Sequence, residues 1–278
     1  MTLEDALRPP PEGIERRPAN FAARLLMGGP VTLVTSAFRG EQNVMPLAWH
    51  APLSSDPPLI GISIERSRHS VDMIQHSEEF ALNFPARPLI HHVQYLGALT
   101  GAEVDKFEAT QLATFPAARL TAPLIEGCAA WIECEVQQVV PIGDHVLFVG
   151  LPVAVQVDPE AFDERWSVGP EPSRPLHYIG GNRYAVLQRT LEARVPGRGE
   201  APERFLAERI EEELELTREA QERREELLTE LREEIEAGNI VDLSQFDLDA
   251  FIAQALPDLG TSERPGLPGP SESDRSER

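Results

Sequence analysis

Short runs of apolar and β-branched residues alternate with turn-forming residues through the first 190 positions of the chain. Such runs, bounded by Gly, Pro, Asn and Asp, are typical of β-strands. We predict strands over residues 31–37, 43–52, 59–65, 79–84, 128–140 and 145–157, and a short helix over residues 69–76. Because the strands follow one another through tight turns, without a helix between each pair, the pattern favours an antiparallel barrel over a doubly wound parallel sheet.

The pattern changes near residue 195, where aromatic residues become rare and Glu and Arg become frequent. Residues 202–237 predict one long amphipathic helix, because apolar side chains recur among the charged ones at Leu206, Ile210, Leu214, Ala220, Leu227, Leu231 and Ile235. A second helix is predicted to begin near Ser244 and to end at Pro257. The remaining Pro, Gly, Ser and charged residues predict disorder. The chain is thus divided into a barrel domain (1–194), an acidic helical extension (195–256) and a disordered tail (257–278).

The distribution of charge follows the same division. The 278 residues include 46 acidic and 25 basic side chains, for a net charge of -21. Residues 1–194 carry net -8 and residues 195–278 carry net -13. Nucleic acids and anionic membrane surfaces attract clustered Lys and Arg, so we expect neither as a partner.

The chain also lacks the usual signals for secretion or membrane insertion. Its start has acids and prolines where a secretory signal has a basic end and an apolar run. Its most apolar stretch, residues 146–155, is far shorter than the ~20 residues that a membrane-spanning helix needs. Cys128 and Cys134 fall on one predicted strand, about 20 Å apart, which is too far for a disulfide. We expect a soluble cytoplasmic protein with reduced thiols.

Several common catalytic motifs are absent from the sequence. No GxGxxG follows a predicted strand and no GxxxxGK[ST] occurs, which excludes the Rossmann and P-loop classes. Cys128, Cys134 and His145 lack a fourth ligand and the spacing of a zinc site, so we predict no metal.

Five segments, in chain order, carry a more specific signal. They are residues 43–56 (NVMPLAWHAPLSSD), 57–70 (PPLIGISIERSRHS), 100–107 (TGAEVDKF), 143–150 (GDHVLFVG) and 178–184 (YIGGNRY). Together they resemble the flavin reductase-like, FMN-binding split-barrel family, which includes flavoredoxins and the reductase components of two-component monooxygenases. The resemblance covers roughly residues 20–191. It implies a six-stranded antiparallel barrel with Greek-key connections, a homodimer, and FMN, or alternatively FAD, near the subunit interface. The helical extension departs from the family pattern, which ends soon after the fifth segment.

The resemblance implies that the first segment lines the flavin ring. A flavin ring is a flat and mostly apolar plate with a polar edge, so an extended strand that offers backbone groups and apolar contacts suits it. The residues concerned are Asn43, Met45, Pro46, Leu47, Ala48 and Trp49. The alternative is that Met45 and Trp49 are only half-buried strand residues.

The second segment offers groups for the FMN phosphate. A protein of net charge -21 needs local cations to hold an anion, and helix N-termini also favour anions. Arg66, Ser67 and Ser70 are the leading predicted contacts, with Ser63 and His69 beside them. The alternative is that Ser67 or Ser70 caps the helix while Arg66 and Arg68 are solvated.

Two further residues enter through the resemblance. Lys106 is the only lysine in the chain, and the family likeness implies that it lies near the flavin. Its alternative is an ordinary surface position. His145 matches a position on the nicotinamide side of the family's site, and its alternative is a strand-end histidine bonded to Asp144 or to a backbone carbonyl.

These residues lead to one preferred function and two alternatives. The preferred function is an NAD(P)H:flavin reductase in which the protein aligns two rings for hydride transfer. The first alternative is a flavoredoxin-like FMN electron carrier that serves a partner protein. The second is a non-catalytic protein that acts through its helical extension by binding a protein partner. The alternatives for the extension are that one half of its helix packs on the barrel or its dimer mate, and that it is a solvated charged helix without a partner.

Overall fold

The computed structural model describes residues 11, 13–191, 193, 195–196 and 201–236. They belong to two compact units, Met1–Thr190 and Leu191–Arg278, each described here by itself. The predicted second helix near Ser244 and the predicted tail over 257–278 lie outside the described residues.

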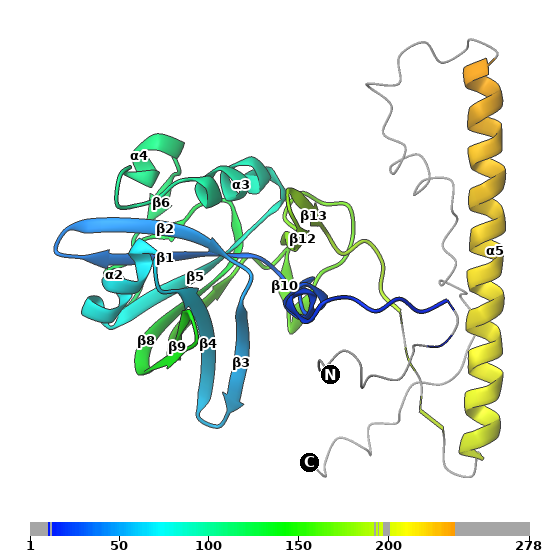
Figure 1. The fold of residues 1–278 in the computed structure, drawn as a ribbon, viewed down its shortest axis with the longest axis horizontal. Coiled ribbons are helices and arrows are strands. Elements are labelled where there is room, and N and C mark those ends of the chain that lie inside the picture. The colour runs from blue at the N-terminus through cyan, green and yellow to red at the C-terminus, as the bar shows by residue number, and fades with distance from the viewer. Residues whose placement is uncertain (1–10, 12, 192, 194, 197–200, 237–278) are drawn as a thin grey trace, which may run out of the picture. The chain divides into compact units, whose positions relative to one another are not determined.

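The first unit is built on a seven-stranded antiparallel sheet that curls into a barrel (Figure 1). The order of its strands across the sheet is β2-β1-β5-β8-β9-β4-β3. Their bounds are β1 Thr32–Phe38, β2 Glu41–Leu47, β3 His50–Ser55, β4 Pro58–Glu65, β5 Glu79–Pro85, β8 Cys128–Ile142 and β9 His145–Val157. The mainly β, antiparallel fold expected from the sequence is therefore confirmed.

The strand count is the part of that prediction that was wrong. Residues 43–52, predicted as one strand, divide into β2 and β3 at Ala48 and Trp49. The division arises because β2 pairs with β1 while β3 pairs with β4, at the opposite edge of the sheet. The Trp49 carbonyl already accepts a hydrogen bond from Ser63 N of β4, at 2.9 Å. The chain thus crosses from one sheet edge to the other within two residues.

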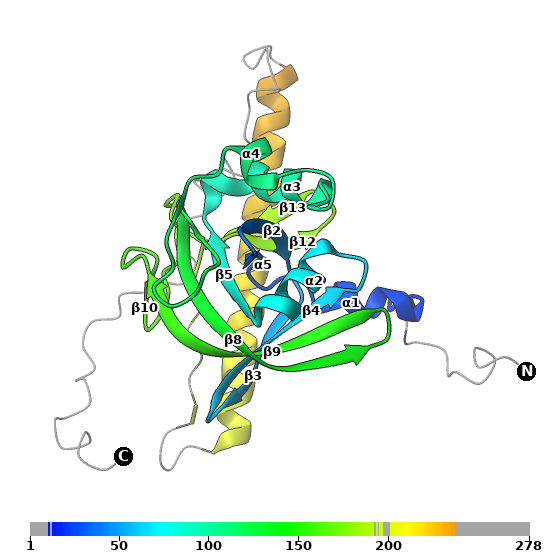
Figure 2. The ribbon, with the colours of Figure 1, turned by 90° about the vertical axis from the view of Figure 1, so that its left-hand side faces the viewer.

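Strands β8 and β9 form a long curved hairpin (Figure 2). Register shifts between Glu133 and Cys134 and between Val136 and Gln138 mark bulges, which bend a strand and increase its twist. Gly150 of β9 faces Phe80 so closely that a Cβ at this position would lie 2.6 Å from Phe80 Cζ. A glycine here lets the core aromatic ring lie against the strand.

Alternate residues of the strands point into two hydrophobic clusters. In β1, Val34 faces the barrel interior, where it joins Ile62, Phe80 and Phe148. Its neighbour Leu33 faces the other side, where Val93 and Leu96 of α3 (Ile90–Ala98) cover the sheet. The period-two alternation of the sequence thus supplies both layers of the core.

Short helices and small sheets complete the first unit. The helix predicted over 69–76 is confirmed as α2, His69–Ser77, and it contacts β1. Helices α3 and α4 (Lys106–Thr110) contact β2. The other elements are η2 Ala19–Phe21, α1 Ala22–Leu25, η3 Arg87–Leu89, β6 Thr114–Phe115, β7 Leu124–Ile125, β10 Phe162–Asp163, β11 Arg165–Trp166, β12 His177–Gly180 and β13 Arg183–Ala185.

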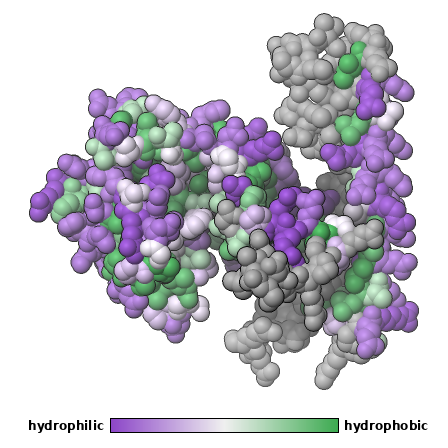
Figure 3. All heavy atoms as spheres, in the orientation of Figure 1, coloured by the Kyte–Doolittle hydropathy of each residue, from purple (hydrophilic) through white to green (hydrophobic). Residues whose placement is uncertain are grey.

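The described secondary structure of the second unit is the helix α5, Pro202–Glu236, which confirms the predicted C-terminal helix. Its surface is mainly hydrophilic with a few hydrophobic patches (Figure 3). Leu206, Ile210 and Leu214 are all more than half exposed, at 54%, 59% and 58%. Ion pairs such as Arg204 with Glu208 and Arg223 with Glu226 run along the helix. No helix in the described part of the chain has the length and apolarity needed to cross a membrane.

Candidate functional site

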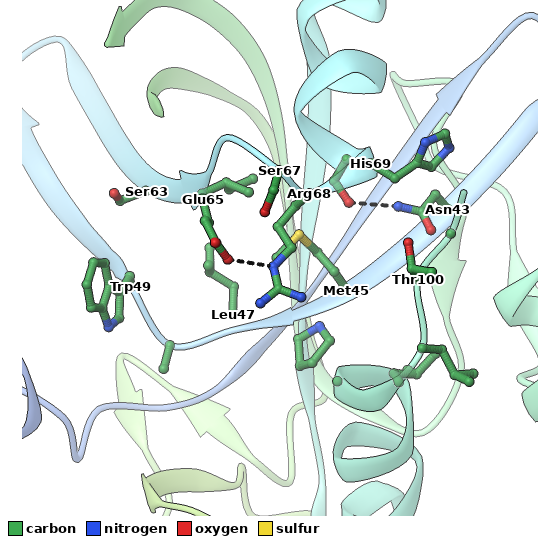
Figure 4. A pocket seen from close by; sticks show the side chains of 18 of the residues that line it. Asn43, Met45, Leu47, Trp49, Ser63, Glu65, Ser67, Arg68, His69 and Thr100 are labelled. Atoms are coloured by element: carbon green, nitrogen blue, oxygen red, sulfur yellow. Dashed lines mark hydrogen bonds and ion pairs between the residues drawn. The ribbon is translucent and has the colours of Figure 1, made fainter. Parts of the chain in front are cut away.

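A cavity of about 330 Å³, the first cavity, opens mainly where four segments of the barrel unit meet, and Met27 and Tyr178 of β12 complete its lining. These segments are the end of β2, the end of β4 with the start of α2, the chain from α3 to α4, and the start of β9. Figure 4 shows the cavity running from Trp49 at one end to Asn43 and His69 at the other. The five segments that carried the sequence signal each contribute at least one residue to its lining.

The apolar wall of the first cavity comes from β2 and the residues just after it. Met45, Pro46, Leu47, Ala48 and Trp49 line it. Leu47 is buried, Met45 and Pro46 are half-buried, and Trp49 is 41% exposed. β2 is an edge strand that pairs only with β1. The N–H and C=O groups along its other edge pair with no strand, so they are available to a bound molecule. Five of the six predicted contacts of the ring, Met45 to Trp49, thus share one extended wall.

The polar end of the first cavity is the start of α2. Ser67, Arg68, His69 and Ser70 line it, and Ser70 is buried. The helix has no side-chain cap, since its N-cap residue is Arg68. The alternative in which Ser67 or Ser70 caps the helix is therefore wrong. Uncapped N–H groups at a helix start favour an anion, because they are unsatisfied donors at the positive end of the helix dipole.

Lys106 brings a buried amine to the same end. Its side chain is only 5% exposed, which contradicts the surface-lysine alternative, and Nζ donates a 3.2 Å hydrogen bond to the carbonyl of Leu96. Asp105, just before it, caps α4 by accepting a bond from Glu108 N at 3.0 Å. Burial, and then the positive charge of Arg68, lower the pKa of Lys106 to about 8. The amine is thus poised to change charge near neutral pH unless an anion binds beside it.

The structure brings Arg68 to the first cavity in place of Arg66, the arginine predicted to contact the phosphate. Arg68 Nε pairs with Glu65 Oε2 at 3.1 Å, and both side chains line the cavity (Figure 4). Arg66 lies outside the lining, and its Nε donates to the carbonyl of His145 at 3.4 Å. The chain turns from β4 into α2 at this point, so neighbouring side chains point to different sides.

His145 and Trp49 stack at the opposite end. Their ring centroids are 4.7 Å apart and the ring planes differ by 19°. His145 Nδ1 lies 2.7 Å from Asp144 Oδ1, and this hydrogen bond lowers the pKa of the Asp144 carboxyl. The bond to Asp144 matches one part of the alternative reading, yet His145 also lines the first cavity. His145 is therefore both a strand-end histidine bonded to Asp144 and a residue of the cavity wall.

All predicted site residues other than Arg66 therefore meet in one cavity. They are Asn43, Met45, Pro46, Leu47, Ala48, Trp49, Ser63, Ser67, His69, Ser70, Lys106 and His145. Lining residues that the prediction missed include Met27, Glu65, Arg68, Gly101 and Tyr178. Glu65, Arg68, Gly101 and Tyr178 fall within the segments that signalled the family, whereas nothing in the sequence marked Met27.

The backbone at Gly101 packs closely against the side chains of Asn43 and His69 at the polar end of the first cavity. A Cβ at this position would collide with Asn43 Oδ1 and would lie 3.0 Å from His69 Cδ2. The loop between α3 and α4 can approach the two side chains only because residue 101 has no side chain.

Comparisons with known proteins show which family the sequence resembles. The family described as flavin reductase like domain matches residues 24–187. An uncharacterized protein of Archaeoglobus fulgidus is 38% identical over 110 residues, and an NADH:FMN oxidoreductase of Rhodococcus qingshengii is 26% identical over 132 residues. The aligned segments cover 40% and 48% of this chain, and each spans 62% of the relative's length.

A solved structure extends the likeness to three dimensions. The crystal structure of an FMN-binding protein from Thermus thermophilus with bound 1-cyclohex-2-enone superposes with a TM-score of 0.55 at 29% identity. The superposition covers 68% of this chain and 97% of that one. Since the family match runs from within α1 to just beyond β13, and so takes in the whole barrel, the chain belongs to the flavin reductase-like domain family.

Proposed function

We propose that the protein is an NAD(P)H-dependent flavin oxidoreductase that holds FMN in the first cavity. One observation carries the proposal: a single cavity joins a flat apolar strand wall to an uncapped helix start with Arg68 and Lys106 beside it. FMN has the same two parts, a flat ring and a phosphate joined by a flexible chain. The Rhodococcus relative, named as an NADH:FMN oxidoreductase, supports the same assignment.

The ring end of this proposal rests on the edge strand. Met45 and Leu47 offer apolar surface, and the unpaired backbone edge of β2 offers N–H and C=O groups to the polar rim of the ring. The sheet already fixes these backbone donors and acceptors in place, so binding a planar ligand costs them little conformational entropy.

The phosphate end needs positive charge because the barrel region itself is acidic. Ser67 and Ser70 hydroxyls, the first N–H groups of α2, Arg68 and Lys106 together form an anion site. Glu65 holds Arg68 at 3.1 Å and keeps its guanidinium over the cavity. An anion that accepts a bond from Lys106 compensates the cost of burying its ammonium group.

The far end of the cavity suits the electron donor. Bound FMN would supply the chemistry of hydride transfer from NAD(P)H, and the residues at this end would align the donor. The stacked pair of Trp49 and His145 offers a flat surface on which a nicotinamide ring can be aligned. Asp144 orients the imidazole through the 2.7 Å bond to Nδ1.

The absorbance spectrum of the purified protein, recorded without oxygen, tests the proposal. We expect bound FMN to give a yellow protein that NADH or NADPH bleaches, with steady turnover when free flavin is added. A yellow protein that neither nucleotide bleaches would support the carrier alternative instead. A protein that cannot be reconstituted with FMN or FAD overturns both and leaves an interaction role.

A variant pair separates the donor site from the flavin site. We expect His145→Ala to raise the KM for the nucleotide about tenfold or more while leaving the Kd for FMN within about twofold, since a lost ring contact of about 1.4 kcal/mol is a factor of ten. His91→Ala, at an exposed position on α3 that does not line the first cavity, is the matched control.

We propose in addition that the protein is a homodimer. Several apolar residues near the tip of the β8–β9 hairpin are exposed, namely Val139, Val140 and Ile142 at 40%, 37% and 52%. An exposed apolar patch on a soluble protein commonly marks an interface. Sedimentation of the wild type beside Val140→Glu checks this, because a charge within the interface is expected to give monomers.

A further inference from the structure

A second cavity of about 390 Å³ adjoins the first and has a different chemical character. The two share a wall made of Pro46, Leu47, Ala48, Gly97 and Tyr178. The second cavity alone is lined by Val31, Val93, Gln94, Ala98, Gly181 and Tyr184. Flavin and nicotinamide recognition, as proposed above, use none of these six residues.

No Asp, Glu, Lys, Arg or His of the described chain lines the second cavity, whereas Glu65, Arg68, His69, Lys106 and His145 all line the first. A phosphorylated or carboxylated molecule would therefore lose its hydration there without gaining a cation in return. The second cavity is suited to a neutral occupant.

Two tyrosines give the second cavity an aromatic side. The rings of Tyr178 and Tyr184 lie 5.5 Å apart, tilted by 54°. Burial, and then the neighbouring Tyr178, raise the pKa of Tyr184. Aromatic rings favour other flat rings in offset or tilted arrangements.

Two hydrogen-bonded pairs lie among these surfaces: Tyr178 with the carbonyl of Gly181, at 3.4 Å, and Tyr184 with Gln94. The Tyr184 hydroxyl donates a 2.9 Å hydrogen bond to Gln94 Oε1. This bond uses the hydroxyl hydrogen, so the Tyr184 oxygen keeps lone pairs that accept, and the Gln94 amide keeps N–H groups that donate. A hydroxyl group on a ligand matches such a pair because it both donates and accepts.

We propose that the second cavity is a binding site for a neutral hydroxylated aromatic compound, separate from the site of the flavin. Its volume lies at the lower end of the range usual for small-molecule sites, which is about 300–1,000 Å³. The assignment of the first cavity to flavin rests on the proposed function, while the assignment of the second rests on its own lining. Residues 46–48 line both cavities. A compound bound in the second cavity would therefore contact the same residues against which the flavin ring is proposed to lie.

The test uses 2-naphthol as the probe and 2-naphthoate as its charged counterpart. Equilibrium dialysis of the full-length protein, with and without saturating FMN, measures the binding of both compounds and needs no catalytic activity. We expect 2-naphthol to bind at least tenfold more tightly than 2-naphthoate, and FMN not to displace it. Equal binding of the two probes, no binding of 2-naphthol, or its competitive displacement by FMN overturns the proposal.

Ala98→Trp places the measured binding in this cavity. Ala98 is exposed at the end of α3 and lines only the second cavity, so a tryptophan there fills the space without entering the core. We expect a tenfold or greater loss of 2-naphthol binding, with the Kd for FMN within twofold of wild type, and Ala98→Ser as the matched control. Unchanged 2-naphthol binding in the tryptophan variant overturns the proposal. Failure of FMN to bind the wild type, with 2-naphthol still bound, would count against the proposed function alone.

Discussion

Asn43 Nδ2 donates a 2.7 Å hydrogen bond to Ser70 Oγ, and both residues are buried. The bond joins the edge strand β2 to the first turn of α2, through two residues that are 27 positions apart along the chain. Since the Ser70 oxygen already accepts from Asn43, its own hydrogen is available for donation into the first cavity. One hydroxyl thus fixes the helix start and offers a donor to an anion.

We expect Ser70→Ala to weaken FMN binding about tenfold, which corresponds to about 1.4 kcal/mol for one charge-assisted hydrogen bond. Riboflavin, which has no phosphate, is expected to lose much less. Fluorescence quenching of each flavin on titration with protein measures both affinities. Ser77→Ala, on the same helix but away from the first cavity, is the control. An equal loss for the two flavins would show that Ser70 acts on the wall and not on the phosphate.

The lowered pKa of Lys106 predicts two opposite dependences on pH. Below about pH 8 its buried amine is charged, which favours a bound anion but disfavours the empty fold. As the pH rises above about 8, FMN affinity is expected to fall. The free energy of unfolding of the empty protein is expected to rise over the same range, until the pH reaches the pKa of lysine in the unfolded chain. Isothermal titration and urea unfolding between pH 7 and pH 9.5 measure the two.

Lys106→Gln is the variant that isolates this titration. It keeps a polar side chain of similar length without the charge, so both pH dependences should flatten, and FMN affinity at pH 7 should fall to the level that the wild type reaches at high pH. Persistence of the wild-type pH profile in Lys106→Gln would assign it to another group.

The close approach at Gly101 predicts that even a methyl group disturbs the polar end. Gly101→Ala would push Asn43 away from Ser70, and we expect about a tenfold loss of FMN affinity. Gly97→Ala is the comparison, because a Cβ there meets only Pro46 Cγ, at an ordinary 3.4 Å. The two Kd values should differ severalfold, and a similar effect of both substitutions would contradict the steric explanation.

A buried carboxylate on β8 predicts a large loss of stability that does not depend on the cofactor. Glu133 is fully buried, and its oxygens accept bonds from the backbone N–H groups of residues 118, 119 and 120 and from Gln156 Nε2. Glu133→Gln turns one acceptor into a donor that faces other donors, which should cost about 2–4 kcal/mol of unfolding free energy. Glu135→Gln, exposed on the same strand, should change it by less than about 0.5 kcal/mol. Urea unfolding of both variants measures these changes in the free energy of unfolding.

Removal of residues 196–278 should leave flavin binding unchanged. Every residue that lines the first cavity lies between Met27 and Tyr178. We therefore expect the shortened chain to bind FMN with a Kd within about twofold of wild type, as measured by fluorescence quenching. A large loss of affinity would assign the helical extension a part in the flavin site, whereas loss of a co-purifying protein alone would support its predicted role in partner binding.

The sequence was informative where a pattern is local. Alternating apolar residues predicted most strands to within a few residues. The five ordered segments contain all the residues that line the first cavity except Met27, Leu96, Gly97 and Leu99, although the prediction singled out only twelve of the 22. The break at Ala48 and Trp49 was missed because it arises from pairing with β4, a contact that no local pattern encodes. The choice between Arg66 and Arg68 depended on which way the chain turns between β4 and α2. The burial of Lys106 depended on its approach to Leu96 from another helix.

Strand β2, which is paired along one side only, also bears on how the family can change over time. A ligand that is held largely by the main chain of such a strand does not require particular side chains at residues 45–49, provided that these side chains are apolar enough to exclude water from the wall. Substitutions can therefore accumulate along this segment while the cofactor is retained. If the flavin and the second ligand bind as proposed, side chains on either side of residues 46–48 can change the second ligand while the flavin site is kept.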